Sequence, residues 1–168
     1  MGMYCKIKVM KKLLTILVVL FIGSMAFAQS ADVVTDILNT EEVTYGQVCY
    51  LSAIHQGLIS ENASYEDAIN VLYEKGQIKE DVGSYDSVFM ANLAFIFAQI
   101  WPDAKGGVMY RLTNGSPRYA FKKFKNDGIF DSDADPNSYV SGSEALAVLT
   151  SCMVEYGAAD ECMQMDVE

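Results

Sequence analysis

Residues 44–57 read TYGQVCYLSAIHQG, and this stretch carries both a start and a stop signal for a helix. Thr44 and Gln47 have the spacing of a capping box, in which each side chain bonds the backbone N–H of the other residue. Gly57 is typical of the position just past a helix C-terminus. Residues 64–76, SYEDAINVLYEKG, repeat the design with a serine as the cap and a glycine as the stop. The pair predicts two short, consecutive helices.

The same signals recur along the chain with little strand pattern between them. Residues 87–101 are apolar on nearly every face, which predicts a central helix. Pro117 follows a capping serine, and Ser141 with Glu144 forms a second capping box before a helix that we expect Gly157 to end. The side chains expected to face the core include Tyr73, Phe89, Leu93, Ile96, Phe97 and Ile100. We predict an all-α fold, a single compact domain of about six short helices built from helical hairpins.

The N-terminus has the pattern of a cleaved signal peptide. Four lysines precede a short apolar run, and small residues at the last and third-last positions end at Ala28. The run is too short for a comfortable membrane span. We therefore predict a signal peptide (1–28), a helical domain (29–157) and an acidic C-terminal tail (158–168). The expected product is periplasmic or secreted and is not inserted in the membrane.

Charge is distributed unevenly along the chain. All 22 Asp and Glu residues follow Ala28, whereas four of the 12 Lys and Arg residues precede it. The predicted mature protein therefore has eight bases against 22 acids, a net charge of −14. A surface of this charge repels nucleic acid and anionic membranes, so neither is expected as a partner.

The reactive residue types are few. Cys49, Cys152 and Cys162 allow at most one internal disulfide, and the sequence leaves all three pairings open. His55, the only histidine, lies six residues after Cys49, about 240° around the same helix. The two side chains are therefore not expected to face each other as base and nucleophile. We predict no catalytic residue and no required cofactor, and keep an unrecognised envelope enzyme as an alternative.

Alternating aspartates mark the stretch GIFDSDADPNSYVSGSE, residues 128–144. In the calcium loop of an EF-hand, position 6 is Gly and position 12 is a bidentate Glu, whereas Pro136 and Gly142 stand there in this chain. We interpret the stretch as an ordinary polar loop. The alternative is a calcium-stabilised helical domain that uses the 131–144 loop. Its metal ligands would be Asp131, Asp133, Asp135 and Glu144.

One basic segment, between residues 111 and 125, stands out on this acidic chain because its bases alternate with aromatic residues. Such a segment predicts a docking surface, to which arginines contribute bidentate hydrogen bonds and aromatic rings contribute contact area. The alternative is an amphipathic helix with buried aromatic residues and solvated lysines. The candidate binding residues are Tyr110, Arg111, Arg118, Tyr119 and Lys122.

Residues 50–72 and 119–149 look like one unit used twice. Through KNDGIF and VSGSEALAVL, the second unit resembles an S-layer homology repeat, and the resemblance implies a helical-hairpin fold. In that family an Arg at the helix start is a main contact to acidic wall polysaccharide. Gly142 occupies that place here, with Tyr65 in the other unit. The resemblance therefore implies the fold of the family but not its binding to wall polysaccharide.

The chain is also similar to small exported spirochaete proteins of unknown role, through GGVMYRL and RYAFKKF. Taken together, these observations predict an exported, non-enzymatic all-α module that binds a protein or cell-envelope component through the basic segment.

Overall fold

The computed structural model describes residues 32–78, 82–113 and 115–165, with side chains described up to Gly157. The chain divides into two compact units, Met1–Asp36 and Ile37–Glu168. The described residues form seven helices and no strand, which confirms the prediction of an all-α fold. The predicted signal peptide lies outside the described residues.

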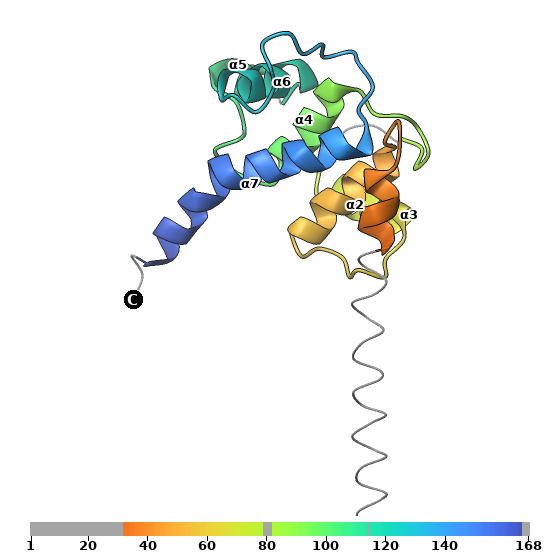
Figure 1. The fold of residues 1–168 in the computed structure, drawn as a ribbon. Helices are drawn as coiled ribbons and strands as arrows, with labels where there is room; N and C mark the ends of the chain where they lie inside the picture. The colour runs from red at the N-terminus through yellow and green to blue at the C-terminus, as the bar shows by residue number, and fades with distance from the viewer. Residues whose placement is uncertain (1–31, 79–81, 114, 166–168) are drawn as a thin grey trace, which may run out of the picture. The chain divides into compact units, whose positions relative to one another are not determined.

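The first helix covers residues 32–38, and the others lie in the second unit. These are α2 Tyr45–His55, α3 Tyr65–Glu74, α4 Met90–Ala98, α5 Val108–Leu112, α6 Pro117–Asn126 and α7 Gly142–Met165 (Figure 1). In the described part, no helix is both long enough and apolar enough to cross a membrane.

The predicted helix starts and stops are confirmed in most places. Thr44 and Gln47 exchange hydrogen bonds in a capping box at the start of α2. Ser141 and Glu144 do the same at the start of α7. The predicted glycine stops at 57 and 76 have positive φ, as does Gly128 after α6, with values between 65° and 79°, a conformation that favours glycine.

Two packed helix pairs hold the core, α2 against α3 and α4 against α6 (Figure 1). Leu93, Ile96 and Phe97 of α4 are almost completely buried, as predicted. Phe89 was expected in this core and is instead 38% exposed, stacked on the ring of Tyr139. The reason is that α4 begins at Met90 rather than at residue 87, so Phe89 lies in extended backbone.

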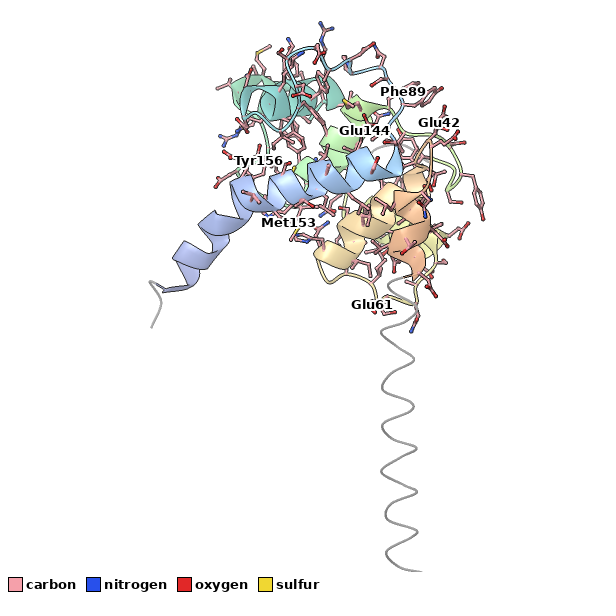
Figure 2. The ribbon with its side chains drawn as sticks, viewed as in Figure 1. Glu42, Glu61, Phe89, Glu144, Met153 and Tyr156 are labelled. Carbon is pink, nitrogen blue, oxygen red and sulfur yellow. The ribbon has the colours of Figure 1, made fainter. Side chains whose placement is uncertain are left out.

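A closed ring of backbone hydrogen bonds joins the starts of α2, α4 and α7. The first amide of each helix donates to a carbonyl in the segment that leads into the next helix of the three. The bonds run from Tyr45 N to Asp86 O, from Met90 N to Ser138 O and from Gly142 N to Thr40 O, each 2.9 Å long. The first N–H groups of a helix have no acceptor within that helix, so the ring satisfies three of them. Figure 2 labels Phe89 and Glu144, which mark the starts of α4 and α7.

A buried valine lies two residues before each of these helices. Val43, Val88 and Val140 are all fully buried. The Val43 amide donates to the Val140 carbonyl at 2.8 Å, and the Val88 amide donates to the Val43 carbonyl at 3.0 Å. A buried valine thus precedes each of the three helices at the same spacing.

The predicted duplication of residues 50–72 and 119–149 pairs α3 with α7, and it stays a prediction. The ring is a separate observation, because it joins α2, α4 and α7 through backbone bonds between their starts.

The helix α7 also continues past Gly157, its predicted end, to Met165. Gly157 does not have the positive φ that would turn the chain out of the helix. The residues that follow it, Ala-Ala-Asp-Glu, begin with the best helix former. The helix therefore includes most of the segment predicted as a tail.

Candidate functional site

The predicted basic segment covers the end of α5 and nearly all of α6, and α6 packs against both α4 and α5 (Figure 1). Ser116 is the N-cap of α6, and Pro117 is its first residue, as predicted. Ala120, Phe121 and Phe124 are buried on the inner side of α6. This packing leaves the opposite side of the helix in solvent.

Three of the predicted binding residues are exposed and basic, and we call these three the basic face: Arg111, Arg118 and Lys122. Neither arginine has a hydrogen bond or ion pair through its side chain within the described residues. Lys122 lies over the half-buried ring of Tyr119, with Nζ 5.6 Å from the ring centre. The positive charges of the basic face are thus not paired with acidic side chains among the described residues.

The neighbouring lysines have internal partners instead. Lys123 forms an ion pair with Asp127, and Tyr156 of α7 donates its hydroxyl proton to the same carboxylate (Figure 2). Burial and this hydrogen bond raise the pKa of Tyr156 well above its usual value, so the phenol stays neutral. Lys125 donates to the carbonyl of Ala134 at 3.4 Å. These contacts hold the end of α6 and so orient the basic face.

Tyr110, the fifth predicted binding residue, has a packing role. It is only 7% exposed, and its hydroxyl accepts a hydrogen bond of 2.6 Å from Gln99 Nε2. Desolvation raises its pKa, so it remains a neutral phenol. Tyr110 therefore anchors α5 to the end of α4, and it also lines the larger of the two pockets described below.

The short helix α5 presents apolar side chains to solvent beside Arg111. Val108 and Leu112 are 72% and 74% exposed, and Met109 is about half exposed. Exposed apolar side chains next to unpaired arginines are the composition of a docking surface.

Two adjoining pockets, of about 360 and 770 Å³, lie between the end of α3, α4 and the turn that joins α5 to α6. They share Ile78, Phe95 and Gly115 in their lining and together form what we call the α4 groove. Asn92 lines the first pocket, and Gln99 lines the second. Further lining residues used below are Tyr73, Lys105 and Arg111.

Sequence reasoning missed this groove, although it carries one local signal. Asn92 and Gln99 are the polar residues of an otherwise apolar helix and are two turns apart, so they lie on one face. Tyr73 was predicted to face the core, but it is 54% exposed at the groove, at the edge of the buried face of α3.

The four predicted calcium ligands line a different cleft, of about 420 Å³. In the described part of the chain, no three carboxylate, thiol or imidazole side chains lie close enough to hold a metal ion. Glu144 accepts from both the amide and the hydroxyl of Ser141, each at 2.8 Å. Asp135 accepts from the Asn137 amide at 2.9 Å. These bonds are those of a helix cap and a polar turn, and the calcium alternative stays a prediction.

The thiols are poorly placed for chemistry. Cys49 and Cys152 are both buried and free, and burial raises the pKa of each to about 12. A thiol with that pKa supplies almost no thiolate at neutral pH. His55 lies at the exposed end of α2, its ring 5.1 Å from that of Trp101.

Comparison of the chain with protein-family models, with curated proteins and with solved structures finds no match.

Proposed function

We propose that this chain is an exported helical module that binds an acidic partner, a protein or cell-envelope component, through the basic face and the exposed residues of α5. The observation that carries the proposal is that Arg111 and Arg118 are exposed and have no side-chain partner among the described residues, on a chain whose acids outnumber its bases 22 to 12. On such a chain, exposed arginines without an acid beside them are available to a partner's carboxylates.

Charge alone would bind weakly, because a solvent-exposed ion pair contributes about 0 to 1 kcal/mol. The exposed apolar residues of α5 can contribute the further binding free energy, through burial of their side chains. Val108 and Leu112, both largely exposed, would be desolvated in a complex and would exclude water from the neighbouring ion pairs. A partner that combines acidic and apolar side chains therefore fits this surface best.

The resemblance to S-layer homology repeats supports the helical-hairpin part of the proposal and not the usual wall ligand. Gly142 stands where that family has its Arg, and a side chain there would collide with the backbone of Ile37. The position is closed by packing, so the basic face is the better candidate for contacting an anionic partner.

The test is photo-crosslinking in the cells that produce the protein, with benzoylphenylalanine in place of Leu112. A control carries the same probe at Tyr85, which is 80% exposed outside this surface. We expect a specific adduct from position 112 alone, and its loss on Arg118→Glu with Lys122→Glu while the far-UV spectrum is unchanged. Equal adducts from both positions, or an adduct that survives the charge reversal, would contradict the proposal.

A further inference from the structure

We propose that the α4 groove binds a short peptide segment in which an acidic side chain stands next to an apolar one. This inference rests on the proposed function and deepens it, because Arg111 belongs both to the basic face and to the lining of the groove. The inference specifies which part of the acidic partner is bound, namely a short segment with one acidic and one apolar side chain.

The shape of the groove suits a chain. Each of its two pockets falls within the size range of ligand sites, and the two share Ile78, Phe95 and Gly115 in their lining. Two neighbouring pockets of this size can take successive side chains of an extended segment that runs over them.

The wall is apolar and the rim is cationic. Ile78 and Phe95 are less than 10% exposed, so they present firm edges between which an apolar side chain can be buried. Lys105 and Arg111 both line the larger pocket and are exposed, and none of the described lining residues of either pocket is acidic. An acidic residue of the ligand would therefore meet a cation, which Arg111 can engage through two parallel hydrogen bonds.

The two amides of α4 favour a peptide over other anions. The Gln99 NH₂ group donates to the Tyr110 hydroxyl and to the Phe95 carbonyl, and the Asn92 NH₂ group donates to the Tyr45 hydroxyl. Both N–H donors of Gln99 and one of the two of Asn92 are thus in use, and the carbonyl oxygens of the two side chains have no donor among the described residues. A ligand that supplies N–H groups, as a peptide backbone does, satisfies them.

The charge of the whole chain limits how acidic the ligand can be. A formal net charge of −10 repels a long polyanion, whereas salt screens that repulsion beyond about 8 Å and leaves the local cations to act. A ligand with one or two acidic side chains beside an apolar one gains the local attraction of the cations and meets little long-range repulsion.

The experiment is an NMR titration of ¹⁵N-labelled protein, purified from cells that express the full sequence, with acetyl-Asp-Leu-Phe-amide up to about 1 mM. The neutral acetyl-Asn-Leu-Phe-amide and the cationic acetyl-Lys-Leu-Phe-amide serve as matched peptides. We expect shifts at the amides of Ile78, Phe95 and Gly115, with about tenfold weaker binding of the neutral peptide. No shift at these amides, or equal shifts with all three peptides, would overturn the proposal.

Paired variants separate the groove from the basic face. Arg111→Gln should weaken acetyl-Asp-Leu-Phe-amide about tenfold, whereas Lys122→Gln, the same loss of charge outside the groove lining, should leave it unchanged. If the peptide fails to bind while the crosslink at Leu112 still depends on Arg118, the groove proposal is wrong and the docking surface stands. If the peptide binds but the crosslink at Leu112 does not form, the proposed docking surface is wrong and the groove proposal stands.

Discussion

Replacing Gly142 by alanine tests the tightest of the described glycine positions. A Cβ at this position would lie 2.6 Å from the carbonyl carbon of Ile37 and closer still to its oxygen. Both atoms are backbone, so no flexible side chain can move away. The substitution also strains the hydrogen bond from the Gly142 amide to the Thr40 carbonyl, which closes the ring.

The magnitude follows from three contributions. Overpacking against rigid backbone costs about 3 kcal/mol, and the strained hydrogen bond costs about 1 kcal/mol more. The better helix propensity of alanine recovers at most about 1 kcal/mol. Gly142→Ala should therefore lower the free energy of unfolding by about 3 kcal/mol.

The matched control is Gly157→Ala in the same helix. A Cβ at Gly157 meets nothing within 4 Å, and this glycine has no positive φ. Alanine there should raise the free energy of unfolding by about 0.5 to 1 kcal/mol. Urea unfolding followed by circular dichroism measures both variants. A loss of less than about 1 kcal/mol at Gly142 would refute the reasoning about close packing.

Three further outcomes are expected. The buried Cys49 thiol, with its pKa raised to about 12, should resist iodoacetamide at neutral pH and react only after unfolding; rapid labelling of the native protein would show that it is accessible. The pKa of Tyr156 is raised in the folded state by burial and by Asp127, so the stability this gives is complete below pH 10 and falls above it, when only the unfolded phenol ionises. Between pH 10 and 11, Tyr156→Phe should therefore lose about 1 kcal/mol less stability than the parent chain, and equal losses would contradict the assignment. Because Glu144 is bonded to Ser141, millimolar calcium should not raise the melting temperature; a rise that Asp133→Ala abolishes would establish the calcium alternative.

Local signals in the sequence were sufficient for the helix starts. The capping boxes at Thr44 and Ser141 depend on residues three positions apart, so their chemistry can be read without the rest of the fold. The exposed basic face was also predictable, because charged side chains on an amphipathic helix point away from the core.

What could not be predicted depends on partners distant in sequence. The backbone from Ser87 to Phe89 is extended because it bonds segments around residues 43 and 138, and no local pattern announces that pairing. The α4 groove combines residues from α3, α4 and the α5–α6 turn, so its lining appears only when the helices are placed. The packing role of Tyr110 is likewise not predictable locally, because its hydrogen-bond partner, Gln99, lies 11 positions away at the C-terminus of α4.

The ring at the starts of α2, α4 and α7 also sets the order in which the chain can fold. Its last bond joins Gly142 to Thr40, roughly 100 positions apart, and closing so long a loop is slow. The other two hydrogen bonds of the ring join residues that are closer in sequence, so they can form earlier. The ring is complete only when the Gly142 bond has formed. The amide of Gly142 should therefore be the last of the three to gain protection from hydrogen exchange during refolding.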